Sequence, residues 1–224
     1  MQRFRSDFEY HDRRSKARHV WEKYRPILES ATVLDVGSDE CHLREHLPDA
    51  ARYHGVGLGG SPDRRVDLER QRLPFADGAF ETVLCLDVLE HIENPQQSFD
   101  ELCRVASGHV VVSLPNPWRA FWRNLNRGRW RESGGLKFYG LPGEKPADRH
   151  KWFFSLSEAE AFVQRRAEAN GWRVLQLDYE GQGRRRPGLR GRLRRWVLGR
   201  LLGGPLPWRD LEAGSLWAVL EPVR

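Results

Sequence analysis

Two histidines are the side chains best suited to move a proton in this sequence of 224 residues. His91 lies just after the apolar run 80–87, and His150 lies among charged and aromatic residues in the segment 148–154. An imidazole has an unperturbed pKa of about 6.5, so it can accept a proton from a hydroxyl group at neutral pH. Each histidine is therefore a candidate general base, and the alternative for His91 is that it only fixes its loop.

Carboxylates follow other short apolar runs. Asp35, Asp67 and Asp87 each lie at or near the end of such a run. A carboxylate there can pair with a cationic group of a ligand. Gly37, close behind Asp35, lets the backbone come near a ligand. For the pair Ser38-Asp39 the alternative is that both side chains only cap the helix expected next.

The cysteines indicate neither a disulfide framework nor a metal centre. Cys41, Cys85 and Cys103 are the three cysteines of the chain, and their spacing matches no metal-binding pattern. They fit reduced thiols. The sequence therefore assigns no metal ligand.

Strand patterns alternate with helix patterns along the chain. Strands are expected at 31–36, 53–58, 65–68, 80–87, 109–114, 172–179 and 215–220. Helices are expected at 3–25, ended by Pro26, at 40–47, at 95–105, and from Ser155 or Ser157 to about 170, while 118–150 is expected to be irregular. This alternation predicts an α/β fold with an open sheet. Ligands bind at the carboxyl ends of the strands in such sheets, where the candidate residues lie.

Four segments together resemble the class I S-adenosylmethionine-dependent methyltransferases, of the methyltransferase type 11-like group. They are VLDVGSDECHL at 33–43, VDL at 66–68, LPFADGAFETV at 73–83 and LDVLEH at 86–91. The resemblance covers 31–116 closely and, through GWRV at 171–174, most of the remaining core. It implies a three-layer Rossmann-like fold, with a mostly parallel seven-stranded sheet and an antiparallel last strand, and S-adenosylmethionine as the cofactor.

The resemblance also implies roles for particular residues. Asp35, Gly37 and Ser38 would line the methionine end of the cofactor, and Asp67 and Leu68 would line its adenine. Asp87 and Val88 would form the floor beneath the sulfonium, and Asp39 and Leu58 complete the expected cofactor set.

The chain departs from this family at three positions. Asp39 and Cys41 stand where relatives usually have glycines, and Gly57 stands where they have an acid for the ribose hydroxyls. A β-carbon at Cys41 is expected to narrow the turn, and the missing carboxylate removes about 1.5–3 kcal/mol of charge-assisted hydrogen bonding. Asp63 is a candidate substitute for that acid. The alternative is a non-catalytic binding or scaffold protein that keeps the fold.

The acceptor side is expected in residues 118–154, where nine aromatic side chains alternate with Arg and Lys. Such a segment can stack on sugar rings, bases or lipid headgroups, or it can be a lid with its own small core. The Asn-Pro-Pro-Tyr signature of amino-group methylation is absent, which favours an oxygen acceptor. The segments 137–142 and 148–154 resemble methyltransferases that accompany cell-surface polysaccharide assembly. We therefore expect O-methylation of a saccharide or lipid-linked glycan, with RNA methylation as an alternative.

The net charge of +6 is local. Residues 184–200 hold 8 arginines and no acid, which leaves the rest of the chain at −2. Within 184–204, one helical face carries Leu189, Leu193, Trp196 and Val197, which suggests contact with an anionic membrane surface. The alternatives are a solvated helix, a contact in a homo-oligomer or, least favoured, nucleic acid.

We expect one methyltransferase domain over 1–224. Its parts are an N-terminal helix (1–26), a substrate lid (118–154) and an Arg-rich insert (181–214) before the last strand. No apolar run is long enough to span a bilayer, and the N-terminus lacks the apolar stretch of a secretory signal. The expected location is the cytoplasm, at the inner face of the membrane if the Arg-rich segment binds there.

Overall fold

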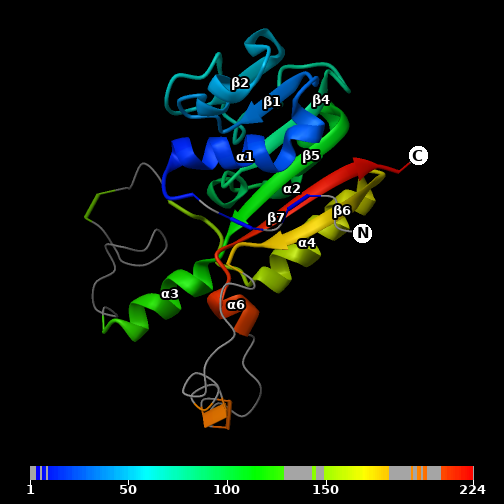
Figure 1. Ribbon diagram of the computed structural model, residues 1–224. Coiled ribbons are helices and arrows are strands. Elements are labelled where there is room, and N and C mark those ends of the chain that lie inside the picture. Colours follow the sequence, from blue (N-terminus) through cyan, green and yellow to red (C-terminus); the bar gives the residue numbers. More distant parts are fainter. Residues whose placement is uncertain are drawn as a thin grey trace.

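A seven-stranded sheet forms the centre of the protein (Figure 1). The computed structural model describes residues 4–5, 7–8, 10–128, 143–144, 149–181, 193, 196–197, 199–200 and 208–223. The strands are β1 (Val33–Val36), β2 (Tyr53–Gly57), β3 (Arg64–Arg65), β4 (Phe80–Leu86), β5 (Ala106–Pro115), β6 (Trp172–Tyr179) and β7 (Ser215–Pro222). Their order in the sheet is β3-β2-β1-β4-β5-β7-β6.

The sheet is parallel except for β7, the last strand of the chain. β1 to β5 pair in parallel, whereas β7 runs antiparallel to both of its neighbours, β5 and β6. This confirms the fold expected from the sequence. The chain builds outward from β1 on one side and from β4 on the other, so the order reverses between these two strands. Their carboxyl ends, where Val36 is level with Cys85, therefore mark the switch point at which such sheets bind ligands.

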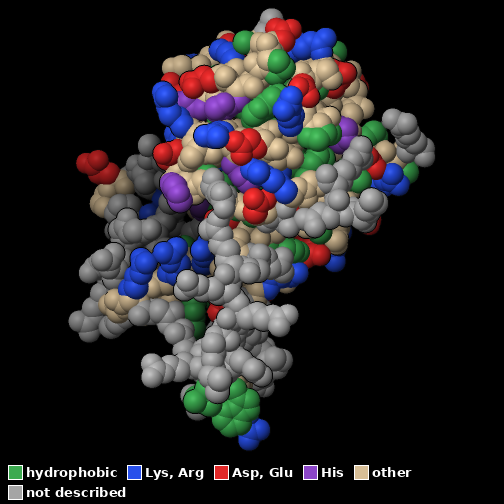
Figure 2. All heavy atoms as spheres, viewed as in Figure 1, with side chains coloured by type: hydrophobic (Ala, Val, Ile, Leu, Met, Phe, Trp, Pro, Cys, Tyr) green, Lys and Arg blue, Asp and Glu red, His purple; other side chains and the backbone are tan. Residues whose placement is uncertain are grey.

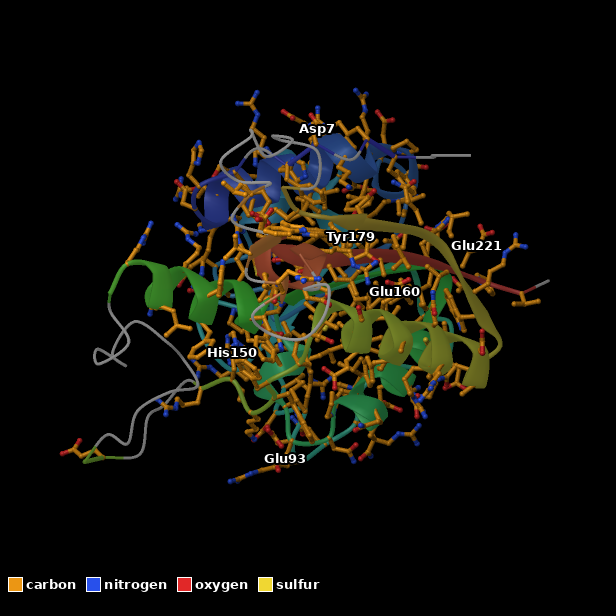
Figure 3. The ribbon with its side chains drawn as sticks, turned by 90° about the horizontal axis from the view of Figure 1, so that it is seen from below. Asp7, Glu93, His150, Glu160, Tyr179 and Glu221 are labelled. Carbon is orange, nitrogen blue, oxygen red and sulfur yellow. The ribbon has the colours of Figure 1, made fainter. Side chains whose placement is uncertain are left out.

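Alternate residues of the central strands face two separate cores. On one face α1 (Arg13–Leu28) packs with Phe4 and Phe8 against residues such as Leu84 and Trp217. On the other face α2 (Pro95–Val105) and α4 (Leu156–Ala169) cover a larger core. Figure 3 shows the three layers from below, with α1 on one side of the strands and α2 and α4 on the other.

The N-terminal helix begins later and ends later than the sequence pattern predicts. Asp12 accepts a hydrogen bond from the Ser15 backbone at 2.7 Å and returns one from its own N–H to the Ser15 hydroxyl, so the helix starts at Arg13. Pro26 lies inside the helix and does not end it. It removes one backbone donor, but the burial of Ile27 and Leu28 holds the last turn in place.

Two further elements are shorter than predicted. The helix expected at 40–47 is a 3-10 turn, η1 (His42–His46), because Cys41 before it has left-handed backbone angles. The strand expected at 65–68 is reduced to the two residues of β3, because the chain turns at Asp67, whose carboxylate accepts the Glu69 N–H at 3.0 Å.

Part of the segment predicted to be irregular is helical. α3 (Pro117–Asn126) starts where the Asn116 side chain accepts the Arg119 N–H at 3.3 Å and Pro117 occupies the first turn. α6 (Trp208–Glu212) lies inside the predicted Arg-rich insert. Much of both inserts, including 129–142 and 182–192, lies outside the described residues. In the part of the chain that is described, no helix is both long and apolar enough to cross a bilayer.

Candidate active site

A cavity of about 570 Å³ opens at the carboxyl ends of β1, β2 and β4. Its walls come from α1, from the loops after these strands and from the segment before α4. It brings together these predicted residues: Asp35, Gly37, Ser38, Asp39, Leu58, Asp87, Val88, His91 and His150.

Asp67 and Leu68 are not among the residues that line this cavity. The Asp67 carboxylate accepts the Glu69 N–H and lies 3.4 Å from Arg70, and the Leu68 side chain packs against the main core. Their predicted contact with adenine stays a prediction that the cavity does not support.

The loop after β1 requires glycine at Gly37. Its φ is +81°, and a Cβ there would lie 2.2 Å from the Val88 Cγ2 atom. Asp39 and Cys41 also have left-handed backbone angles, with φ of 50° and 55°. Each such non-glycine residue costs roughly 1–2 kcal/mol. The loop thus keeps glycine-like backbone angles at the two positions where the family has glycines.

Cys41, whose β-carbon was expected to narrow the turn, is not among the residues that line the cavity. Its sulfur lies 3.4 Å from the Ser38 hydroxyl and 3.6 Å from the Ser61 carbonyl oxygen, within the core beneath α1. Asp63 does not replace the missing ribose acid either. Its carboxylate accepts the Gly55 N–H at 2.8 Å and pairs with Arg44, away from the cavity.

Asp87, which lines the cavity, is held by two partners. The Lys16 ammonium lies 2.6 Å from one carboxylate oxygen, and the Ser113 hydroxyl donates to the other at 2.6 Å. Burial pushes the pKa of Asp87 upward, but Lys16 and Ser113 outweigh it, so the pKa lies below its usual value. Asp87 is therefore a carboxylate at neutral pH.

The pKa of Asp35 is shifted in the opposite direction to that of Asp87. Burial raises its pKa from 3.8 to about 6, although the Tyr53 hydroxyl, which donates to it at 2.6 Å, and the charge of Lys16 both oppose the rise. The carboxyl group of Asp35 therefore titrates close to neutral pH.

The contribution of α1 to this site was not among the features predicted from the sequence. Arg13 pairs with Asp39, and Lys16 pairs with Asp87. Both cations line the cavity together with Ala17 and Val20. The spacing i, i+3, i+4, i+7 places these four residues on one helical face, which was the available signal. What the spacing could not reveal is that this face meets the carboxyl ends of the strands.

Glu90 joins the two predicted histidines. It lies in the short 3-10 turn η3 (Leu89–His91), and its side chain is only 1% exposed. One Glu90 carboxylate oxygen is 3.6 Å from His91 Nε2 and 4.0 Å from His150 Nε2. The imidazole centroids are 4.6 Å apart and nearly perpendicular. The backbone bond from Lys151 N–H to the Glu90 carbonyl, at 2.8 Å, fixes His150 here, near the start of α3 (Figure 3).

A second, more apolar hollow of about 210 Å³ adjoins the cavity, because Glu90 lines both. Trp152, Phe153 and Phe154 form one wall of it. The Trp152 indole donates to the Ile92 carbonyl at 2.7 Å, and the Phe153 ring lies 5.1 Å from that of Trp118. Trp118, Trp152 and Phe153 are each more than a third exposed, so a ligand can reach these residues.

Comparisons with known proteins agree with this architecture. The family model described as "Methyltransferase domain" matches residues 10–177. No protein of curated function matches the sequence.

Solved structures with a similar fold include proteins of more than one activity. The [4+2]-cyclase SpnF is 15% identical over 98% of this chain and 88% of its own, with a TM-score of 0.53. The methyltransferase domain of bacterial CtHen1-C is 17% identical over 94% and 98%, also with a TM-score of 0.53. An S-adenosylmethionine-dependent methyltransferase from Mesorhizobium loti is 15% identical over 92% and 95%, with a TM-score of 0.51. At such identities the likeness shows the fold alone.

Proposed function

The chain belongs to the family of methyltransferase domains, and from that premise we propose that it methylates a hydroxyl oxygen of a saccharide or of a lipid-linked glycan. The enzyme is an S-adenosylmethionine-dependent methyltransferase. The observation that carries the proposal is that Glu90, His91 and His150 line the same cavity as Asp35 and Asp87. Groups that can accept a proton thus lie beside groups suited to a cationic cofactor.

The cavity residues fit the charges of this cofactor. When bound, S-adenosylmethionine supplies an electrophilic methyl group on a sulfonium sulfur. The Asp35 carboxylate can pair with the ammonium group, and the Asp87 carboxylate provides negative charge for the sulfonium. The Arg13 guanidinium also lines the cavity and can pair with the carboxylate of the cofactor's methionine part. Gly37 leaves the backbone of its loop open to close approach.

A hydroxyl acceptor must lose its proton during the transfer. In our proposal the proton passes to the imidazole of His91 or His150 while the O–C bond forms and the C–S bond breaks. The products are a methyl ether, S-adenosylhomocysteine and an imidazolium, which returns its proton to solvent. General base catalysis of this kind contributes about 10²- to 10⁴-fold.

The saccharide part of the proposal rests on the aromatic wall beside the histidines. Trp118, Trp152 and Phe153 are exposed large side chains next to the hollow that shares Glu90 with the cavity. Flat aromatic faces suit the apolar faces of sugar rings and can hold the ring while one hydroxyl is presented to Glu90 and the histidines.

The cofactor part is tested by calorimetric titration with S-adenosylhomocysteine. We expect Gly37→Ala to weaken binding at least about tenfold, because the added Cβ collides with Val88. Gly59→Ala is the matched control, since a Cβ there meets nothing within 4 Å. Asp35→Asn serves as a second variant if Gly37→Ala unfolds. No binding by the wild type would favour a non-catalytic protein of the same fold.

The acceptor is tested by offering methyl-labelled S-adenosylmethionine with a panel of saccharides, glycolipids and RNAs. Label in a saccharide ether supports the proposal. Label in RNA, with binding that weakens steeply as salt rises, would favour the RNA alternative instead. Label in amine groups alone would overturn oxygen as the acceptor.

We also propose that the Arg-rich segment rests on an anionic membrane surface. Leu193 and Trp196 are 62% and 64% exposed, in a segment with 8 arginines and no acid at 184–200. Figure 2 shows hydrophobic side chains grouped at the lower end of the molecule, where Figure 1 draws this orange segment. Flotation with anionic liposomes should carry the protein upward. Equal flotation by a Leu193→Ser/Trp196→Ser variant, or none by the wild type, would overturn this proposal.

A further inference from the structure

Three potential metal ligands converge in the wall of the cavity. Glu90, His91 and His150 each offer one ligand atom, and these atoms all lie within 4.8 Å of one another. We infer that Glu90, His91 and His150 bind one divalent transition-metal ion, which faces the methyl acceptor. The inference about the acceptor rests on the proposed function, whereas the inference about the ion does not.

The geometry is close to that of a metal site. Ligands about 2.1 Å from a common ion lie roughly 3.0–3.4 Å apart in octahedral or tetrahedral arrangements. The distances from the Glu90 oxygen, 3.6 Å to His91 Nε2 and 4.0 Å to His150 Nε2, exceed these values only slightly. His91 and His150 are 25% and 13% exposed and border the cavity, which leaves space beside their imidazoles for the small movements that would close the triad.

The electrostatics of the cavity favour a cation at this point. Asp39 and Asp87 each have a permanent cation from α1 beside them, Arg13 and Lys16. Two imidazoles lie within 4.0 Å of a Glu90 carboxylate oxygen, and the Glu90 side chain is only 1% exposed. A divalent ion at this point adds positive charge beside a buried carboxylate and uses the neutral form of both imidazoles.

The ligand set indicates the class of ion. Two imidazole nitrogens and one carboxylate oxygen suit Zn²⁺, Mn²⁺, Fe²⁺ or Co²⁺, whereas Mg²⁺ and Ca²⁺ prefer oxygen ligands throughout. Three protein ligands leave one or more positions open. A hydroxyl group at an open position would become more acidic, so its proton could pass to solvent water, and a free imidazole would not be needed as the base.

The open positions also narrow the acceptor class. An octahedral ion with three protein ligands has room for two neighbouring oxygens of one substrate. A vicinal diol, common in saccharides, offers two such oxygens, of which one is methylated. We therefore expect diols to be better acceptors than isolated alcohols.

Cobalt binding tests the metal site directly, without any acceptor. Purified protein stripped with a chelator is titrated with Co²⁺, and binding is followed by calorimetry and by the visible absorption of the ion. We expect one equivalent to bind. Glu90→Gln, His91→Ala and His150→Ala should each weaken binding about 100-fold or more, because each removes one ligand.

His42→Ala is the matched control. His42 also lines the cavity, and its Nδ1 lies 3.8 Å from the carboxylate of Glu45, but it is not part of the triad. This variant should bind Co²⁺ like the wild type. If the buried Glu90→Gln variant unfolds, the half-buried His150 and His91 variants carry the test. Less than half an equivalent in the wild type, or equal loss in His42→Ala and His150→Ala, would overturn the metal site.

Failure of the metal site and failure of the proposed function have different signatures. If the wild type binds no Co²⁺ but methylates a saccharide in the presence of chelator, the ion is excluded and the imidazole base remains. If Co²⁺ binds with one equivalent but S-adenosylhomocysteine does not, the proposed function fails and the metal site stands.

Discussion

Helix α1 makes two lysine–aspartate ion pairs that share one length but have different surroundings. Lys16 Nζ lies 2.6 Å from an Asp87 oxygen, and Lys23 Nζ lies 2.6 Å from an Asp178 oxygen. The lysines are seven residues apart, so both lie on the face of α1 that packs on the sheet. The pair at Lys23 is enclosed, with exposures of 0% and 7%, whereas those at Lys16 are 16% and 39%. The enclosed pair can only hold the fold together, while the pair in the cavity can exchange a partner for a ligand.

The surroundings of Lys23 explain its structural role. Its ammonium lies 4.3 Å from the centroid of the Phe8 ring, and burial lowers its pKa in spite of the hydrogen bond to Asp178. Gln176 also donates to Asp178, at 2.8 Å, and to the Phe4 carbonyl, at 2.9 Å. The pair therefore ties the N-terminal segment and α1 to β6.

Removal of the buried acid should have the largest effect. Asp178→Asn leaves the Lys23 ammonium enclosed without its counter-ion, and we expect a loss of about 3 kcal/mol in the free energy of unfolding. The affinity for S-adenosylhomocysteine should not change, because Asp178 does not line the cavity. Urea denaturation and calorimetry measure the two quantities. A stability loss below about 1 kcal/mol would contradict the assignment of this pair.

A double replacement controls for the loss of packing. Lys23→Met with Asp178→Leu removes both charges and keeps apolar volume, so it should recover most of the lost stability. If the double variant is as unstable as Asp178→Asn, the effect comes from the side-chain network around Gln176 and not from the unpaired charge.

The corresponding change at the ion pair in the cavity should lower ligand affinity more than it lowers the free energy of unfolding. Asp87→Asn keeps the shape, and asparagine tolerates the left-handed φ of 57° found at this position. Because the pair is partly exposed, we expect only about 1 kcal/mol of lost stability. The affinity for S-adenosylmethionine should fall about tenfold, which is the loss expected from one charge-assisted contact.

S-adenosylhomocysteine is the internal control for that variant. It lacks the sulfonium charge, so its affinity should fall much less than that of S-adenosylmethionine. Calorimetric titration of both ligands gives the ratio. Equal losses for the two ligands would mean that Asp87 does not act on the sulfonium, and the contrast between the two ion pairs would then rest on stability alone.

The sequence predicted elements that are set by nearby residues. α2 spans Pro95–Val105 as predicted, because a proline in the first turn and the Asn94 side chain, which accepts the Gln97 N–H, fix its start locally. The apolar run of β4 likewise predicted a central strand buried on both faces.

Features that depend on distant contacts were not predictable in this way. Lys16 and Asp87 are 71 positions apart, and Lys23 and Asp178 are 155 positions apart. No local pattern records which carboxylate a lysine will meet. The sequence likewise marked His91 and His150 as alternative bases, and only the fold places them 4.6 Å apart beside Glu90. The backbone angles of Cys41 were hidden for a similar reason, since its side chain is accommodated by the core beneath α1.

The smallest predicted effect concerns the pH dependence of ligand binding at Asp35, which faces the cavity near Lys16. Burial raises the pKa of Asp35 to about 6, so the group is charged above this pH and neutral below it. An ammonium group binds the charged form better. The affinity for S-adenosylhomocysteine should therefore fall about twofold from pH 7 to pH 6, and further at pH 5.

Several titratable groups face Asp35 and must be separated from it. Burial raises the pKa of the Tyr53 hydroxyl and of the Cys85 thiol, so both stay protonated over this range. His91 and His150 also line the cavity, so their imidazoles have to be separated from Asp35 as well. Asp35→Asn distinguishes these sources, because calorimetry between pH 5 and pH 7 should show a flat profile if Asp35 is responsible. An unchanged slope in this variant would assign the pH dependence to the histidines.

Stability gives a second readout of the same carboxyl group, with the opposite sign. The pKa of Asp35 is higher in the folded protein than its usual value of 3.8, so its contribution to stability is complete below 3.8 and is lost as the pH rises through about 6. Ligand binding should therefore improve over the pH range in which Asp35 stabilises the fold less. The buried Lys23–Asp178 pair does not line the cavity, so it should not make stability and ligand affinity change in opposite directions with pH. Asp178→Asn should therefore leave the pH profile of binding unchanged.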